Sequence, residues 1–122
     1  MGPYEEAVEQ FRWEDVEAQF SWAQSGKVNL AYEAIDRHVA AGNGEKIALH
    51  YSDSTRDESI TYAEMKRQSD KFANVLRGLG VAKGDRVFIF MPRTPELYYS
   101  LLGIIKIGAV AGPLFEAFME TA

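Results

Sequence analysis

A nearly continuous apolar run, from Asp85 to Met91, constrains the fold of this chain most strongly. Only its first two residues are charged, so the strand it predicts has both faces covered, as strands of parallel sheets do. Thr94 and Pro95 then predict the start of a helix that ends near Gly108. A second apolar run follows at residues 109–115. Strand, helix and strand in this order predict a right-handed βαβ unit and an α/β fold class.

The segment before this unit predicts a small hairpin and a long helix. Residues 47–51 alternate between apolar and polar, and residues 60–62 return as a second strand across a polar connection. Thr61 and Glu64 have the spacing of a capping box, in which each side chain bonds the other residue's backbone amide. The helix that follows has one apolar face and ends at Gly78.

A further helix is expected between Asn29, its N-cap, and Gly42. His38 lies on its apolar stripe without a second ligand at metal-binding spacing, so a core histidine is favoured over a ligand or base. His50 falls on the polar face of the first strand.

Residues 1–25 form an acidic, aromatic helical segment that is interpreted as a unit of its own. Residues 1–24 hold six acids and one base, which accounts for the whole net charge of −5, because the remaining 12 bases and 12 acids cancel. No basic patch supports nucleic-acid binding. Helical spacing restarts near Arg12, and the segment carries five aromatic side chains. Since so much aromatic surface is costly in water, we expect it to pack on the α/β body or on a neighbouring chain.

Several classes of protein are excluded by simple features. The 122 residues suit one domain or a piece of one, and the absence of cysteine excludes a disulfide framework and thiolate sites and fits the cytoplasm. No targeting signal is recognised. Residues 97–115 are too interrupted by Gly108, Gly112 and Pro113 for a membrane span. The glycine-rich stretch 78–84 follows a helix and precedes a strand, the reverse of a phosphate loop.

Two observations predict an incomplete domain. The helix after Thr94 is apolar nearly all round, and a two-stranded parallel sheet leaves uncovered edges. The missing cover is either a partner or further chain, and self-association of these residues through apolar surface is expected.

Six blocks of sequence resemble, in order and spacing, the N-terminal part of bacterial acetyl-coenzyme A synthetases of the acyl-adenylate-forming superfamily. They are Phe20–Trp22, Ala31–His38, Ile60–Tyr62, Lys83–Val87, Met91–Glu96 and Gly112–Glu120. The resemblance covers essentially the whole chain. It implies an incomplete part of a larger α/β adenylate-forming domain, with residues 1–25 as the N-terminal segment and residues 26–122 as the truncated start of the large domain.

The resemblance also implies an activity. Acetate attacks the α-phosphate of ATP, with magnesium assisting, and coenzyme A then displaces AMP from the acetyl-adenylate. The family's phosphate loop, adenine contacts and catalytic lysine follow the matched segment, so no catalytic or metal-binding residue is assigned here. No bound cofactor and no activity are expected of these residues alone. One weak correspondence, set against a plain packing role for the two aromatics, puts four residues near the coenzyme A channel: Phe115, Glu116, Ala117 and Phe118.

Two other functions remain open. The chain is alternatively a catalytically dead α/β interaction module derived from this family, or part of a ligase for another short-chain acid. Arg86 and Arg93 are interpreted as solvated charges instead of phosphate ligands.

Overall fold

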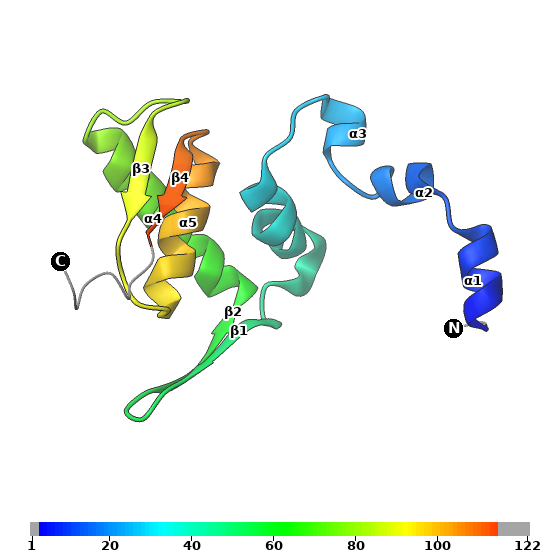
Figure 1. The fold of residues 1–122 in the computed structure, drawn as a ribbon, viewed down its shortest axis with the longest axis horizontal. Coiled ribbons are helices and arrows are strands. Elements are labelled where there is room, and N and C mark those ends of the chain that lie inside the picture. The colour runs from blue at the N-terminus through cyan, green and yellow to red at the C-terminus, as the bar shows by residue number, and fades with distance from the viewer. Residues whose placement is uncertain (1–2, 115–122) are drawn as a thin grey trace.

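A computed structural model describes residues 3–114 of the chain as three short N-terminal helices followed by a mixed α/β body (Figure 1). Two segments, η1 and η2, are turns of π-helix, with a wider winding than an α-helix. In chain order the elements are α1 (Tyr4–Gln10), α2 (Trp13–Glu17), α3 (Trp22–Ser25), η1 (Tyr32–Asp36), η2 (Val39–Asn43), β1 (Ile47–Ser52), β2 (Asp57–Thr61), α4 (Tyr62–Gly78), β3 (Arg86–Ile89), α5 (Pro95–Lys106) and β4 (Val110–Pro113).

The strands form two separate two-stranded sheets. β1 pairs with β2 antiparallel, and β3 pairs with β4 parallel, from Arg86 opposite Val110 to Ile89 opposite Pro113. α5 connects the two parallel strands, and α4 packs along α5. The predicted α/β class, the hairpin and the strand–helix–strand unit are therefore confirmed.

α5 lies between two hydrophobic clusters, although it still exposes Tyr98, which is 40% exposed. One side of the helix packs with the parallel sheet and α4 through Ile104, and the other packs with η1, β2 and the start of α4 through Leu102. The buried members of the first cluster are Leu76, Ile89, Ile104 and Ala109, and those of the second are Ile35, Ile60 and Met65.

None of the described helices is long and apolar enough to cross a membrane.

The caps of the two long helices agree only in part with the sequence pattern. The Glu64 amide donates to the Thr61 hydroxyl at 3.1 Å, as a capping box requires. The Glu64 carboxylate does not complete the box, because it accepts hydrogen bonds from the side chains of Arg67 and Gln68. At the start of α5, Pro95 occupies the first turn as predicted.

Gly103 lets α4 and α5 approach closely. A Cβ atom there would lie 2.9 Å from the Ser69 carbonyl oxygen and 3.1 Å from the Ala73 nitrogen, both backbone atoms that cannot move aside alone. We expect Gly103→Ala to lower the free energy of unfolding by about 1–3 kcal/mol, the usual cost of overpacking. Chemical denaturation followed by circular dichroism measures this change.

The matched control for this prediction is Gly78→Ala. Gly78 belongs to α4, and a Cβ atom there would meet nothing within 4 Å. Alanine is the better helix former, so the control should leave stability unchanged or raise it. Equal losses in the two variants would contradict the close-approach explanation.

The segment after Asn29 is helical, but its buried face differs from the predicted stripe. Asn29 caps it as expected, since its Oδ1 accepts from the amides of Ala31 and Tyr32. At 3.6 residues per turn Ala34 would share the inward stripe with His38, but Ala34 is exposed, whereas Glu33 is buried. π-Helical winding shifts which positions face inward, and a stripe drawn at 3.6 residues per turn misses this. His38 is half-buried, with its ring 5.0 Å from that of Tyr62, and so lies at the margin of the core.

The N-terminal arm, defined as residues 3–25, packs on the body only at its inner end, where Ser21 and Phe20 contact Glu33 and Arg37, and not along its length as its aromatic content predicts. It runs away from the α4–α5 unit, and none of its helices contains a buried residue (Figure 1). Trp13 is 74% exposed. The aromatic side chains shield one another instead, Phe11 edge-on to Trp13 and Phe20 stacked on Trp22 at 4.2 Å. Packing of the arm on a neighbouring chain remains a prediction.

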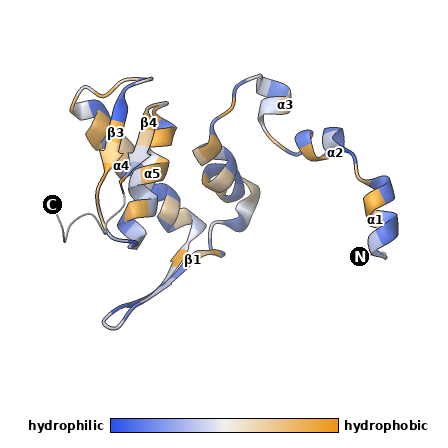
Figure 2. Cartoon of the chain, viewed as in Figure 1, coloured by the Kyte–Doolittle hydropathy of each residue, from blue (hydrophilic) through white to orange (hydrophobic). Residues whose placement is uncertain are grey.

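One face of the parallel sheet is also uncovered. Side chains alternate along a strand, so Val87 and Ile89 face α5 while Phe88 and Phe90 face the opposite way. Phe88 is 66% exposed, and Val110, which lies opposite Arg86 on β4, is exposed as well. Figure 2 shows that hydrophobic colouring runs through this unit and recurs along the arm. Uncovered apolar surface is thus present on the sheet and the arm, and singly on α4 at Val75 and on α5 at Tyr98.

Candidate functional site

The candidate site is the edge of the parallel sheet where β3 and β4 end. The chain leaves β3 at Ile89 and reaches α5 through residues 90–94. The Leu114 amide donates to the Ile89 carbonyl oxygen at 2.8 Å, so the segment after β4 still runs beside the end of β3. Ligands of open α/β sheets bind beyond the carboxyl ends of such strands. The four residues predicted near a coenzyme A channel, Phe115, Glu116, Ala117 and Phe118, come next in the chain and lie outside the described residues.

The two arginines considered as phosphate ligands lie at opposite ends of β3. Arg93 is exposed in the connection to α5, at the candidate edge. Arg86 is exposed at the first position of β3, at the far end of the sheet. They therefore cannot act on one phosphate at the candidate edge.

Arg56 ties the hairpin to the start of α5 beside this edge. Its Nε donates to Glu58 Oε1 at 2.6 Å, and its Nη2 donates to Glu58 Oε2 at 2.9 Å and to Glu96 Oε1 at 3.0 Å. The three side chains, named here the Arg56 clamp, join residues 40 positions apart. The sequence gives no local signal for this contact, and sequence reasoning missed it.

The Arg56 clamp shifts the acidity of its carboxylates. The hydrogen bond from Arg56, and next that from Thr94, lower the pKa of Glu96 to about 2. The hydrogen bond from Arg56 also lowers the pKa of Glu58. Both carboxylates are more stable as anions in the folded chain than in the unfolded one. Their contribution to stability is therefore complete above the ordinary pKa of about 4.5 and is lost as the pH falls toward 2.

This yields a pH-dependent prediction for Arg56→Gln. We expect the variant to melt at a lower temperature than the parent chain at pH 7, with the difference shrinking toward pH 3 as the parent loses the same stabilisation. Thermal melts at the two pH values measure it. Arg93→Gln is the control, because Arg93 forms no ion pair among residues 3–114. A difference that grows on acidification would contradict the assignment.

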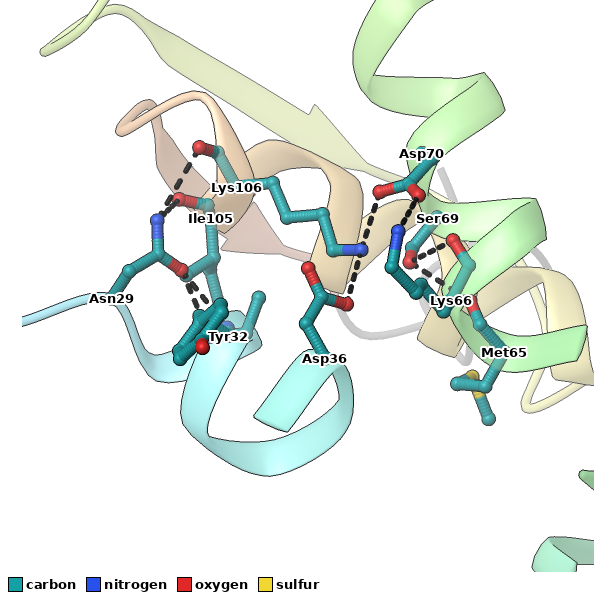
Figure 3. Close-up of polar contacts among 10 residues, drawn as sticks. Asn29, Tyr32, Asp36, Met65, Lys66, Ser69, Asp70, Ile105 and Lys106 are labelled. Carbon is teal, nitrogen blue, oxygen red and sulfur yellow. Dashed lines mark hydrogen bonds and ion pairs between the residues drawn. The ribbon is translucent and has the colours of Figure 1, made fainter. Parts of the chain in front are cut away.

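A second polar cluster, the Lys106 network, joins three helical segments (Figure 3). The Lys106 Nζ donates to Asp36 Oδ1 at 2.8 Å and to Asp70 Oδ1 at 2.6 Å, and Lys66 pairs with the second oxygen of Asp70. Lys106 ends α5, Asp36 ends η1, and Asp70 and Lys66 lie on α4. The side chains of Lys106 and Asp36 are 10% and 17% exposed, so their ion pair is largely withdrawn from water, whereas Asp70 is 38% exposed.

The Lys106 network is completed by hydrogen bonding at the end of α5. The Asn29 side-chain amide donates to the carbonyl oxygens of Ile105 and Lys106, both at 3.3 Å, and so satisfies acceptors that a helix end leaves free (Figure 3). Partial burial acts to raise the pKa of Asp70, but the hydrogen bonds from Lys106 and Lys66 outweigh it and lower that pKa. This cluster fixes the helices relative to one another and contains no nucleophile paired with a base.

A third cluster consists of Ser21, Glu33 and Arg37 and is named here the Glu33 latch. It holds the inner end of the N-terminal arm. The Glu33 side chain is 3% exposed and accepts hydrogen bonds from the backbone amide, at 3.0 Å, and the hydroxyl of Ser21. Arg37 pairs with Glu33 at 3.3 Å, and its guanidinium lies 4.8 Å above the ring of Phe20. A buried carboxylate needs such partners, but the sequence does not indicate which ones.

The described residues form no complete catalytic or metal-binding site. No group of three histidine, cysteine or acidic side chains among residues 3–114 could hold a metal ion. Gly80 and Gly84 have positive φ in the turn between α4 and β3, so the glycine-rich stretch ends a helix, as predicted. This part of the chain supplies a scaffold that carries the carboxyl edge of the parallel sheet.

Comparison with known proteins places this scaffold in context. Residues 36–122 match the family described as AMP-binding enzyme. The chain is 60% identical over 120 residues to the acetyl-coenzyme A synthetase of Bacillus subtilis, covering 98% of this chain and 21% of that protein. It is 43% identical over 102 residues to the acetyl-coenzyme A synthetase of Streptomyces avermitilis, covering 83% of this chain and 16% of that protein. The chain thus spans about a fifth or less of the length of these curated relatives.

A solved structure shares the fold as well as the sequence. The crystal structure of Brucella canis acyl-CoA synthetase superposes with a TM-score of 0.80 at 32% identity, covering 97% of this chain and 21% of that one. Because the N-terminal arm makes up about a fifth of the 122 residues, a match over 97% of them includes most of the arm.

Proposed function

Because the chain belongs to the AMP-binding enzyme family, we propose that it is the N-terminal part of an ATP-dependent acetyl-CoA synthetase. The observation that carries the proposal is its 60% identity to the acetyl-coenzyme A synthetase of Bacillus subtilis, which extends over 98% of the chain. Residues 1–25 are the N-terminal segment and residues 26–122 the start of the large domain. The absence of cysteine supports a cytoplasmic location.

The proposed reaction has two balanced steps. An acetate oxygen attacks the α-phosphorus of ATP and pyrophosphate leaves, which gives acetyl-adenylate. The coenzyme A thiol then loses its proton and attacks the acetyl carbon, AMP leaves, and acetyl-CoA is formed. Magnesium, when bound, would supply neutralisation of the phosphate charge in the first step.

The described residues do not fit the nucleotide or magnesium by themselves, so no step is assigned to them. They include no carboxylate cluster for a metal ion and no glycine-rich loop in front of a helix. Their proposed part is structural: α4, α5 and the Lys106 network support the parallel sheet, whose carboxyl edge leads into Phe115–Phe118. We propose that these four residues approach coenzyme A, as their resemblance to the family implies.

The test compares two polypeptides for acetate-dependent exchange of pyrophosphate into ATP. The chain of 122 residues should show no exchange above a heat-treated sample. A polypeptide that contains it and continues through the length of the Bacillus relative should exchange pyrophosphate with acetate and release AMP when coenzyme A is added. Faster exchange with propionate or butyrate would assign a different acid. Failure of the long polypeptide with every short acid would favour an interaction module without chemistry.

A further inference from the structure

The turn of the β1–β2 hairpin holds Arg56 in a fixed place. The Asp53 Oδ1 accepts hydrogen bonds from the amides of Thr55, at 2.7 Å, and Arg56, at 2.8 Å. The Asp53 amide donates in return to the Arg56 carbonyl oxygen at 2.8 Å. The Arg56 Cζ lies 5.4 Å from the centre of the Tyr51 ring. Both the backbone and the side chain of Arg56 are therefore positioned by the hairpin itself.

The Arg56 clamp connects the hairpin to residues 90–94, the segment that joins β3 to α5. The Arg56 Nη2 donates to Glu96, in the first turn of α5, at 3.0 Å, and Glu96 also accepts from the Thr94 side chain. The Thr94 amide donates to the Pro92 carbonyl oxygen at 2.8 Å. A continuous series of polar contacts thus runs from the hairpin to the connection that leaves β3.

The position and exposure of the Arg56 clamp point to more than a contribution to stability. The side chains of Arg56 and Glu96 are 34% and 51% exposed, and exposed ion pairs usually contribute little to stability. Residues 90–94 form no helix or strand, so their conformation depends on contacts with neighbouring elements. They leave β3 at Ile89, whose carbonyl oxygen accepts from the Leu114 amide just past β4. The clamp therefore orients the loop that borders the candidate edge.

We propose that Arg56 is a positioning residue of the candidate edge, which holds residues 90–94, through Glu96, in the conformation that coenzyme A requires for binding. The inference rests on the proposed function, in which Phe115–Phe118, the continuation of β4, approach coenzyme A. Arg56 touches no substrate and acts only through the loop. Loosening the loop weakens the binding of coenzyme A in the ground state and the transition state alike, which raises KM and leaves kcat unchanged.

The test measures the two steps separately in the long polypeptide, which contains this chain and continues through the length of the Bacillus relative. Arg56→Gln should raise the KM for coenzyme A at least about five-fold and leave kcat within about two-fold of the parent value. Acetate-dependent pyrophosphate exchange needs no coenzyme A and should also stay within about two-fold. Thr94→Val keeps the ion pairs of Arg56 but removes the hydroxyl bonded to Glu96, and it should raise the same KM.

Arg67→Gln is the matched control. Arg67 is an exposed arginine that also pairs with a glutamate, Glu64, but within α4. The control should leave the KM for coenzyme A unchanged. Hydrogen exchange of the peptide that spans residues 90–97 supplies a readout independent of activity. It should be faster in Arg56→Gln than in the parent polypeptide and unchanged in Arg67→Gln.

The outcomes separate this inference from the proposed function. With an active parent, an unchanged KM for coenzyme A, an equal loss in both steps, or an equal rise in the control would overturn the positioning role. A parent that shows no pyrophosphate exchange with any short acid would overturn the proposed function. Hydrogen exchange then decides the positioning of the loop, which an unchanged rate in Arg56→Gln would overturn. If a thermal melt shows that Arg56→Gln is unfolded, Thr94→Val decides both measurements.

Discussion

Truncation of Ile104 to alanine is expected to lower the free energy of unfolding by about 3–4 kcal/mol. Ile104 is 0% exposed and packs with Leu76, Ile89 and Ala109, so it joins both long helices to the parallel sheet. The truncation removes buried apolar surface and leaves a cavity that the rigid sheet cannot close. Urea denaturation followed by far-ultraviolet circular dichroism measures the change.

The control for Ile104→Ala is Val75→Ala. Val75 is exposed on α4, and alanine favours the helix more than valine does. The control should change stability by less than about 0.5 kcal/mol, as exposed substitutions usually do. A loss of under about 1 kcal/mol in the Ile104 variant would mean that the α4–α5–sheet cluster is not the core of the chain.

Replacement of Lys106 by methionine should cost about 2–3 kcal/mol, because it leaves the Asp36 carboxylate, which is largely withdrawn from water, without its cation and removes one of the two cations of Asp70. Methionine keeps most of the side-chain volume, so the effect is electrostatic more than steric. Lys71→Met is the control, since Lys71 is exposed on the same α4 helix that carries Asp70. The loss at Lys106 should exceed the loss at Lys71 several-fold at pH 7.

The loss at Lys106 also has a predicted pH dependence. The pKa of Asp70 in the folded chain is lowered from 3.8, so its stabilising contribution is complete above about pH 4 and disappears as the pH falls further. The difference between the parent chain and Lys106→Met should therefore be smaller at pH 3 than at pH 7. A difference that does not depend on pH would show that lost packing, and not lost charge pairing, destabilises the variant.

The elements that the sequence predicts well are those specified by neighbouring residues. Thr61 and Pro95 mark helix starts, Gly80 marks a helix end, and the apolar run at β3 identifies a parallel strand. Each depends on backbone preferences within a few residues, which a single sequence displays directly. The hairpin and the strand–helix–strand unit follow from the same signals.

The parts that the sequence did not predict depend on distant residues. Lys106 pairs with Asp36 across 70 positions, and Arg56 with Glu96 across 40, with no local pattern to indicate either partner. Burial of Glu33 depends on π-helical winding and on hydrogen bonds from Ser21, 12 positions earlier in the chain. Exposure of Trp13 contradicts an argument from hydrophobicity that is sound for a complete domain. Of the candidate site, the sequence indicated the edge of the sheet but not the clamp beside it.

The contact between Asn29 and the end of α5 has a consequence for biosynthesis. The side-chain amide of Asn29 finds its acceptors, the carbonyl oxygens of Ile105 and Lys106, 76 and 77 residues later in the chain. At about 5–20 residues per second, the ribosome needs about 4–15 seconds to add that length. The nascent helix around η1 leaves the ribosome before the lysine that neutralises Asp36 exists. Synthesis through α5 is therefore the earliest point at which the first helices can lock in place, and a pause in translation before that point prolongs the exposure of an unfinished fold to chaperones and proteases.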